Sequence, residues 1–532
     1  MKRIAASDPK TIGEFFCELN KPFLIPEYQR PYEWETEEIV TLFNDIHEFE
    51  GEVYFLETIM YFENTTHQRE IVDGQQRIIS LFLLIRAMYE LLKNTNWKSD
   101  LKRLIWKFDD NTGDVISPDS VLISSQAISD EANQTFINIL ATGKADGSEL
   151  YSRNYREFQK LLSNLDDIMI FRKKLLELTT ILPIKADDFN STLILFERIN
   201  DRGRQLTDSD IFKSKIYTRL DEISRREFIA RWKLLERKMN IINEPMITLF
   251  NHYMYFARAR DNRQAIFHND GVRNYFLDRN FDALQYPTSM NYLEKIFKLI
   301  RMIKTQNTID GESWSQNIEI RKALDIVRRI SSEWWDYAVS VYYLAPQDEE
   351  DFESNFTRFL HKLISSFAKT YSIKSATTVR KLMIDINFES MHYTHPSFST
   401  ENFSRMEISK SIQSKSKPIQ KMWMSIFVYA NQDELLPMNC VLELILPRKN
   451  SYNPDDKDLV ETIGNFTPLE KEFAQTKNKS FEEKKSCYQK SGIIVTRNLI
   501  EKSSWSFDEI QSRNEEIVDQ ILAILDKWDS EY

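Results

Sequence analysis

The chain is poor in the residues that impose special architectures. It contains only 11 glycines, 15 prolines and 3 cysteines among 532 residues. So little glycine and proline excludes collagen-like and low-complexity chains, and it disfavours a turn-rich β-sandwich. Cys17, Cys440 and Cys487 are too few for a disulfide framework and lack the paired spacing of a zinc site. A reducing, cytoplasmic location is therefore expected.

Long apolar runs are also absent from the sequence. No segment approaches the roughly 20 apolar residues of a membrane-spanning helix, and the first residues lack the apolar core of a signal peptide. We therefore expect no membrane partner. The formal net charge of −11 argues against a protein that coats DNA, but it leaves room for a local basic site. Aromatic residues make up 12% of the chain and indicate large buried cores.

Apolar periodicity predicts a chain that is mainly α with α+β parts. Residues 35–48 place four apolar side chains on one helical face, and the segments 53–62 and 69–73 read as short strands joined by a polar loop. The next segment, 75–93, is apolar almost all round, as expected for a buried helix. From about 125 to 430, a 3.6-residue period predicts a largely helical body.

The pentapeptide DGQQR lies where the second strand ends and the buried helix begins. Gly74 permits a tight turn, and the first N–H groups of the helix offer a site for an anion. Arg77 suits phosphate oxygens, while Gln75 and Gln76 could orient a water or read a base. Asp73 could hold a metal or cap the helix. Taken alone, the pentapeptide fits a plain helix cap and a surface ion pair equally well.

Three segments together resemble one known family. The segments IPEYQRPYEW at 25–34, IVDGQQR at 71–77 and FERINDRGRQLTDSDIFKSK at 196–215 are similar to the N-terminal domain of GmrSD-type modification-dependent restriction proteins. That domain is a relative of the ParB/sulfiredoxin-like fold. One departure is visible, because Glu57 stands where relatives usually have glycine.

The resemblance implies that this region binds and hydrolyses a nucleoside triphosphate (NTP), with Mg²⁺ as the expected cofactor. It implies catalytic roles for Asp73, Gln75, Gln76 and Arg77. The residues that it implies for nucleotide binding are Tyr28, Gln29, Arg30, Gly74, Asn200, Arg202 and Gly203.

The segment 440–528 resembles the HNH-type ββα-metal nuclease domain that follows in many of these proteins. Such a nuclease needs a histidine base and side chains that hold a divalent cation. Here Leu444 stands at the histidine position, and Phe473 stands at or near the position of a later asparagine, whereas Glu443 and Asn465 are retained. We therefore expect a degenerate nuclease domain. The pair of histidines in HYTHP, His392 and His395, is the alternative source of the chemistry.

Residues 213–263 carry 12 basic and 6 acidic side chains. Arg225, Arg226, Arg231 and Lys233 are candidate DNA contacts, because basic residues interleaved with aromatic ones suit a nucleic-acid backbone. The interleaved aromatic residues are Trp232, Tyr253, Tyr255 and Phe256. The alternative is that these charges only solvate exposed helix faces.

These observations predict a nucleotide-binding domain at 1–220, a helical middle at 221–400 and an HNH-like domain at 401–532. The favoured function is that of a component of a prokaryotic antiviral-defence or restriction system. It would bind and hydrolyse NTP at DGQQR, and it would sense DNA, such as modified phage DNA, or a partner subunit. Its partners would be a companion nuclease subunit or further copies of itself. The alternatives are an active, NTP-regulated, modification-dependent DNA endonuclease and a non-catalytic binding scaffold.

Overall fold

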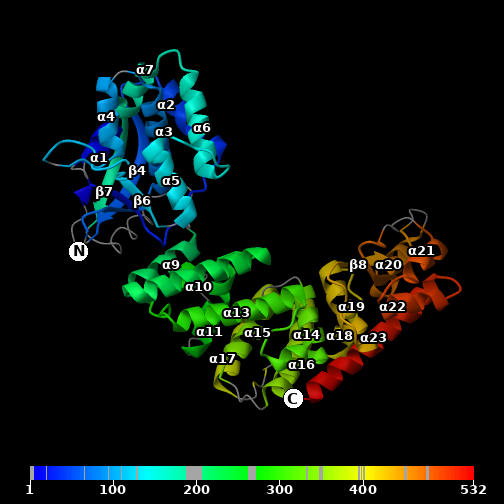
Figure 1. Ribbon diagram of the computed structural model, residues 1–532. Coiled ribbons are helices and arrows are strands. Elements are labelled where there is room, and N and C mark those ends of the chain that lie inside the picture. The colour runs from blue at the N-terminus through cyan, green and yellow to red at the C-terminus, as the bar shows by residue number, and fades with distance from the viewer. Residues whose placement is uncertain are drawn as a thin grey trace. The chain divides into compact units, whose positions relative to one another are not determined.

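The computed structural model forms two compact units, Met1–Arg219 (unit 1) and Leu220–Tyr532 (unit 2) (Figure 1). Helices predominate, so the prediction of a mainly α chain with α+β parts is confirmed. Among the described helices, none combines the length and the apolar character needed to cross a bilayer. The structure describes residues 5–6, 8–18, 21–64, 66–93, 95–109, 111–126, 130–186, 207–261, 271–330, 334–346, 351–393, 396, 398, 402–448, 452–474 and 479–531.

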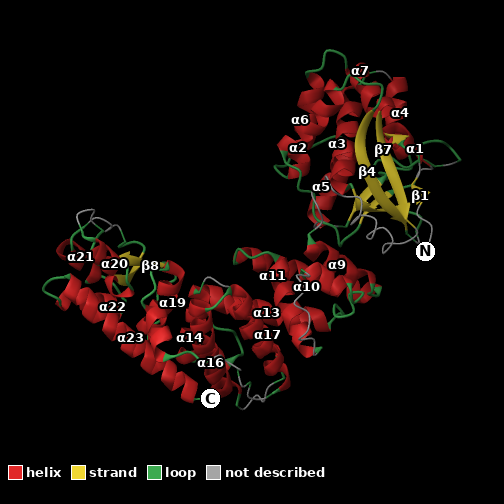
Figure 2. Ribbon diagram, turned by 180° about the vertical axis from the view of Figure 1, so that it is seen from behind, coloured by secondary structure: helices red, strands yellow, loops and turns green. Residues whose placement is uncertain are grey.

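Unit 1 combines one mixed sheet with helices that pack along it (Figure 2). Its strands are β1 (Ala5–Ala6), β2 (Lys10–Thr11), β3 (Phe23–Ile25), β4 (Tyr54–Glu63), β5 (Arg69–Asp73), β6 (Ile123–Ser125) and β7 (Thr179–Ala186). Its helices are α1 (Ile12–Cys17), α2 (Thr36–Glu48), α3 (Gln75–Leu91), α4 (Thr95–Ile105), α5 (Asp130–Thr142), α6 (Leu150–Ser163), α7 (Ile168–Lys173), which continues into a π-helical turn (Lys174–Leu178), and α9 (Asp208–Thr218).

The sheet of unit 1 has the strand order β1-β7-β4-β5-β3-β6, and β2 also pairs with β7. Strand β4 runs antiparallel to β5 and parallel to β7, while β3 runs parallel to both β5 and β6. The hairpin of β4 and β5 confirms the strands predicted at 53–62 and 69–73. Strand β7 was not predicted, because its pairing partner β4 lies far away in the sequence and leaves no local signal.

The helices that border the site follow the sequence closely. Helix α2 begins with a capping box in which the carboxylates of Glu35 and Glu38 each accept a hydrogen bond from the backbone N–H of the other residue, and it buries the predicted apolar face. Helix α3 starts directly after β5 and is buried along most of its length. Its contacts with α4, α5 and α6 explain why its sequence is apolar almost all round. The end of β5 is thereby held rigidly against the start of α3.

Within its described residues, unit 2 has one β-hairpin and is otherwise built from helices and loops. Its helices are α10 (Glu222–Ile241), α11 (Met246–Arg260), α12 (Val272–Leu277), α13 (Thr288–Thr305), α14 (Ile318–Arg329), α15 (Trp334–Leu344), α16 (Phe352–Ile373), α17 (Ala376–His392), α18 (Arg405–Ile412), α19 (Lys417–Asn431), α20 (Pro454–Val460), α21 (Phe481–Tyr488), α22 (Ile494–Arg497) and α23 (Phe507–Ser530). Its strands β8 (Cys440–Leu444) and β9 (Phe466–Glu470) pair antiparallel.

One hydrophobic cluster of unit 2 combines side chains that precede residue 400 in the sequence with side chains that follow it. It contains side chains of α14, α15 and α16 together with side chains of α19 and α23. Helix α23 packs against α16, α18 and α19 and so ties the end of the chain to the helical body. The border predicted between a middle region and a C-terminal domain therefore falls inside this unit.

Candidate functional site

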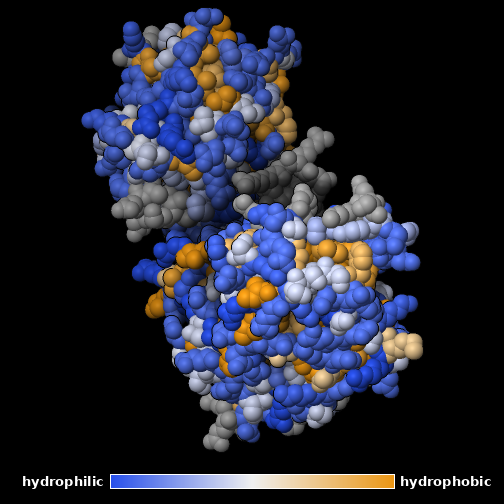
Figure 3. All heavy atoms as spheres, turned by 90° about the vertical axis from the view of Figure 1, so that its right-hand side faces the viewer, coloured by the Kyte–Doolittle hydropathy of each residue, from blue (hydrophilic) through white to orange (hydrophobic). Residues whose placement is uncertain are grey.

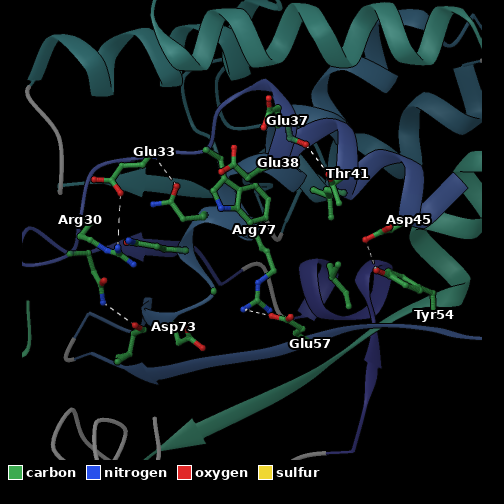
Figure 4. A pocket seen from close by; sticks show the side chains of 18 residues that line it. Arg30, Glu33, Glu37, Glu38, Thr41, Asp45, Tyr54, Glu57, Asp73 and Arg77 are labelled. Carbon is green, nitrogen blue, oxygen red and sulfur yellow. Dashed lines mark hydrogen bonds and ion pairs between the residues drawn. The ribbon is translucent and has the colours of Figure 1, made fainter. Parts of the chain in front are cut away.

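A pocket of about 520 Å³ opens in unit 1 beside the junction of β5 and α3 (Figure 4). This volume lies within the range of small-molecule sites. The loop between β3 and α2, the polar face of α2, the first part of β4 and the DGQQR segment all contribute to its wall. Of the predicted site residues, the described lining includes Gln29, Arg30, Asp73, Gly74, Gln75, Gln76 and Arg77.

Gly74 makes the turn from the strand into the helix. Its φ of +88° lies in the left-handed region, which glycine enters without strain. A Cβ atom at this position would lie 3.1 Å from Cγ1 of Ile59 on the neighbouring strand β4. The turn thus needs glycine both for its conformation and for its space. It leaves the first N–H groups of α3 without intrahelical acceptors at the pocket.

Arg77 lies in the first turn of α3, and its side chain is 13% exposed. Its Nη1 donates a hydrogen bond to the main-chain oxygen of Thr58 at 2.9 Å. Its Nη2 lies 2.9 Å from Oε2 of Glu57, so the two side chains form an ion pair in the pocket (Figure 4). A cationic fork is therefore fixed next to the helix N-terminus, where an anion is favoured.

Arg30 approaches the same pocket from the loop after β3. Its Nη1 lies 4.0 Å from Oε2 of Glu33, and its Nε lies 3.7 Å from Oδ2 of Asp210 at the start of α9. Within the described residues, Arg30 Nε is buried without a hydrogen-bond acceptor. The amide oxygen of Gln75, a residue that is 5% exposed, is likewise buried without a donor. Unsatisfied buried polar atoms of this kind suggest a missing ligand or water.

Gln29 and Gln76 support the pocket wall. The Gln76 amide donates to the oxygen of Pro31 at 2.9 Å and accepts from the N–H of Glu33 at 2.8 Å. The Gln29 amide donates to the oxygen of Val72 at 3.0 Å. Both amides hold the loop after β3 against the β5–α3 junction. Gln75 is therefore better placed than Gln76 to orient a water.

Asp73 ends β5 and carries a perturbed carboxyl group. Burial raises its pKa, while Arg77 and the N–H of Gly74 oppose that rise in part. Glu57 on the neighbouring strand pushes the pKa of Asp73 upward again. A carboxyl group with a raised pKa holds a proton more readily, which suits a general base or acid.

The pocket wall is strongly acidic. It carries six carboxylate side chains but only two arginines, Arg30 and Arg77. The carboxylates belong to Glu33, Glu37, Glu38, Asp45, Glu57 and Asp73. Asp45 accepts a hydrogen bond from the Tyr54 hydroxyl at 3.2 Å, and burial together with this carboxylate raises the pKa of Tyr54 to about 12. An anion would therefore meet a repulsive wall unless a cation accompanied it.

Sequence reasoning did not single out the face of α2 that lines the pocket. Glu37, Thr41 and Asp45 follow one another at four-residue steps and so share this face, and Trp34 stands just before the helix. The spacing was visible in the sequence, but the solvent-exposed face of any amphipathic helix looks the same. Only the sheet beneath it identifies the face as a pocket wall.

Of the other predicted nucleotide-binding residues, Tyr28 alone belongs to the part of the chain that the structure describes. Tyr28 is 1% exposed and donates from its hydroxyl to Oε1 of Glu70 at 3.0 Å, and it is not among the described lining residues. Asn200, Arg202 and Gly203 fall outside the described residues. Their predicted role in the site stays a prediction.

The four candidate DNA contacts lie on α10. Arg231 binds Glu294 and Asn291 at distances of 2.7–2.9 Å and so ties α10 to α13. Arg226 is exposed and pairs with Glu222 one turn earlier, while Arg225 and Lys233 are half-buried. Hydrophilic side chains predominate on the face drawn in Figure 3.

The aromatic residues of this region are not available for stacking on bases. Trp232, Tyr253 and Phe256 are each 1% exposed, and the partly buried Tyr255 packs against the main cluster of unit 2. The expectation that they would contact nucleic acid is therefore wrong. Their helical spacing produces core packing, which the sequence alone did not distinguish from an interleaved basic surface.

The retained HNH-like residue Asn465 has a structural role. Its amide nitrogen donates to the oxygens of Leu446 and Val460, both at 3.0 Å, and its oxygen accepts from the Leu446 N–H and the Trp505 indole. The side chain is fully buried. It fixes the segment after β8 against the start of β9 and has little capacity left for a metal.

The other positions of the nuclease motif are held by packing and by a buried lysine. Glu443 and Leu444 lie in β8 opposite Thr467 and Phe466, and Phe473 packs against a small apolar cluster. Lys484 of α21 is fully buried, and its ammonium group donates to the oxygens of Leu444 and Ile445.

One of the two candidate histidines belongs to the described residues. His392 is exposed at the end of α17, and its Nδ1 lies 2.8 Å from the oxygen of Phe388, while His395 lies outside the described residues. In the part of the chain that the structure describes, no group of three or more His, Cys, Asp or Glu side chains could hold a metal ion.

These features define a class of protein with a mixed α+β unit, an acidic pocket with two arginines at a strand–helix junction, and a helical unit that carries a β-hairpin. The family model "GmrSD restriction endonuclease, N-terminal domain" matches residues 12–217. The model "GmrSD restriction endonucleases, C-terminal domain" matches residues 380–520. The chain belongs to the GmrSD restriction endonuclease family, and the resemblance seen in the sequence is thereby confirmed. Membership gives the protein a role in restriction and antiviral defence, with DNA as the target. No curated protein matches the chain.

Proposed function

We propose that the pocket beside DGQQR binds a nucleoside triphosphate with Mg²⁺ and hydrolyses it as part of DNA restriction. The observation that carries this proposal is the meeting of three anion-binding elements in one cavity. These elements are the uncapped N-terminus of α3 at Gly74, the guanidinium of Arg77 and the guanidinium of Arg30. The fixed position of DGQQR between a buried strand and a buried helix supports a rigid phosphate site.

The donor set around the pocket fits Mg²⁺. Carboxylate oxygens are ligands that this ion prefers, and it usually takes one or two of them together with substrate phosphates. Asp73 lies in the pocket wall and interacts electrostatically with the phosphate-binding Arg77, and its carboxylate would hold the ion. When bound, Mg²⁺ supplies charge neutralisation at the phosphates. This neutralisation would also overcome the excess of acidic side chains in the wall.

The residues of the chain divide the remaining work. Arg77 and Arg30 would orient the phosphates, and the indole of Trp34 in the pocket wall offers an apolar surface for the base. The unpaired Gln75 oxygen would accept a hydrogen bond from the attacking water. Gln76 and Gln29 would act only by holding the loop after β3 in place.

We further propose that the HNH-like hairpin does not cut DNA itself. The hydrogen bonds of Asn465, the apolar side chain of Leu444 and the packing of Phe473 support this proposal, because none of these groups offers a base or a metal ligand. Cleavage would then require a companion subunit or further copies of the chain.

One assay tests both parts of the proposal. Purified full-length protein is incubated with each of the four NTPs and Mg²⁺, with and without plain or modified DNA, and both phosphate release and DNA length are measured. We expect turnover without DNA cleavage, and we expect Arg77→Ala to reduce turnover by at least about 100-fold. Arg172→Ala is the matched control, because Arg172 has a similar exposure of 14% but pairs with Asp100 and Glu177 away from the pocket.

Each part has its own contradicting result. Unchanged turnover in Arg77→Ala would show that the pocket is not the site of hydrolysis. DNA cleavage that disappears in Glu443→Gln would show that the hairpin is an active nuclease.

A further inference from the structure

Glu57 has a backbone conformation that is unusual for its residue type. Its φ is +129°, whereas the other described non-glycine residues with positive φ lie between +48° and +59°. Those values belong to the left-handed helical region, but +129° is a region that glycine occupies almost alone. The position coincides with a register shift of β4 against β7, between Phe55 and Glu57. The bulge therefore lies at a residue that has a strained backbone and a charged side chain.

The strained backbone carries a carboxylate that engages the phosphate-binding arginine. Glu57 Oε2 lies 2.9 Å from Nη2 of Arg77, and both side chains line the pocket (Figure 4). The other terminal nitrogen of Arg77 is already bonded to the oxygen of Thr58. The Glu57 side chain is 51% exposed, whereas that of Arg77 is 13% exposed. The arginine is thus fixed, and the carboxylate is the partner that can swing away.

Both arginines of the pocket lie near carboxylates. Arg30 lies within 4.0 Å of Glu33 and Asp210, and Arg77 lies beside Glu57. The wall holds six carboxylates against two arginines, so an incoming phosphate competes with carboxylates that are already present. Glu57 is the strongest of these competitors, because it makes the shortest ion pair with an arginine of the pocket.

We propose that Glu57 is a built-in counter-anion that occupies Arg77 until a ligand phosphate displaces it, and that it thereby sets the nucleotide affinity of the pocket. This inference rests on the proposed phosphate site. It assigns to Glu57 a role in weakening the binding of every phosphate ligand. A glycine at this position would leave Arg77 free and would remove the backbone strain together with the competing charge.

Titration calorimetry of the full-length protein tests this role. The probes are the four NTPs and inorganic triphosphate, each with Mg²⁺, and the variants are Glu57→Gln and Glu57→Gly. Both variants are expected to bind every probe roughly threefold to tenfold more tightly than the wild type, the range for removing a partly exposed ion-pair partner. Glycine adopts positive φ freely, so Glu57→Gly also preserves the bulge.

Two controls separate competition for Arg77 from a general change of charge. Glu37→Gln removes the same charge from the same pocket, but Glu37 forms no ion pair with either arginine among the described contacts, so we expect less than a twofold change. In an Arg77→Gln background, Glu57→Gln is expected to change affinity less than twofold, because the competed group is gone.

The possible outcomes are distinct. If Glu57→Gln binds the probes no more tightly than the wild type does, the role of Glu57 is overturned. The same holds if Glu37→Gln gains as much affinity as Glu57→Gln. A failure of wild type and both Glu57 variants to bind any probe overturns the proposed nucleotide site itself. If both Glu57 variants bind more tightly, and if the gain from Glu57→Gln disappears in the Arg77→Gln background, the result supports competition between Glu57 and the ligand phosphate for Arg77.

Discussion

Gly74 shows at the scale of a single residue how conformation and space combine. Its φ of +88° would strain any other residue, and a Cβ there would press on Ile59 at 3.1 Å. Gly113 also has a positive φ, +72°, but nothing lies within 4 Å of the position of its Cβ. The two glycines therefore differ in the space around them and share the conformational demand.

We expect Gly74→Ala to lower the free energy of unfolding by about 2–3 kcal/mol and Gly113→Ala by about 1 kcal/mol. The difference measures the contact with Ile59. Only Gly74→Ala should also weaken nucleotide binding, because it shifts the first turn of α3. Urea unfolding and calorimetry measure the two effects, and equal losses in both variants would contradict the close approach at Gly74.

Asp73 belongs to the proposed nucleotide site, and its buried carboxylate lowers the stability of the fold at neutral pH. Burial raises its pKa on folding, so the folded state binds the proton more tightly than the unfolded state does. Its contribution to stability is greatest below the unfolded pKa and is lost as the pH rises through the folded pKa. At pH 7 the ionised carboxylate therefore opposes folding.

Asp73→Asn is accordingly expected to raise the melting temperature at pH 7 while it abolishes NTP turnover. The gain should shrink as the pH falls into the usual carboxyl range, where wild-type Asp73 is protonated as well. Thermal unfolding from pH 7 to pH 4 checks the trend. A melting temperature that is lower in the variant at pH 7 would show that the charge of Asp73 stabilises the fold.

At the scale of elements, the sequence predicted those parts that have local patterns. Helix α2, the hairpin of β4 and β5, and helix α3 were all expected from periodicity, and DGQQR was placed correctly at their junction. Strand β7 was missed because pairing between distant strands leaves no periodic trace. The ion pair of Glu57 and Arg77 was missed for a related reason, since it depends on a bulge in β4 that exists only against β7.

A buried lysine of α21 bonds to the HNH-like hairpin, beside an apolar cluster that the two elements share. The ammonium group of Lys484 donates to the oxygens of Leu444 and Ile445 at 2.7 Å and 3.1 Å. Lys484→Met retains the length of the side chain but leaves both carbonyl groups without this donor. We expect a loss of about 1–3 kcal/mol in the free energy of unfolding.

Lys485→Met is the neighbouring control for this change. Lys485 is more exposed and pairs only with Glu482 of the same helix among the described ion pairs, so its replacement should cost less than about 1 kcal/mol. Denaturant unfolding of both variants provides the comparison. Similar small losses in the two variants would mean that the hairpin does not depend on the Lys484 ammonium.

At the scale of the whole molecule, the two units have separate cores and distinct chemistry. The aromatic residues that suggested base stacking are part of the core of unit 2, so charged side chains alone are left for contacts with DNA on α10. The candidate nucleotide site belongs entirely to unit 1. The sequence indicated this division of chemistry, because DGQQR and the HNH-like segments are far apart. It did not reveal how acidic the pocket is, because the acidic residues come from four separate segments.

The most direct test of the account is equilibrium binding of the four NTPs with Mg²⁺ to the wild-type chain, Arg77→Ala and Arg172→Ala. The account predicts saturable binding of at least one NTP to the wild type and to Arg172→Ala, and a loss of at least about tenfold in affinity for Arg77→Ala. Binding that survives unchanged in a folded Arg77→Ala variant, or no binding to the wild type at all, would contradict a nucleotide site at DGQQR.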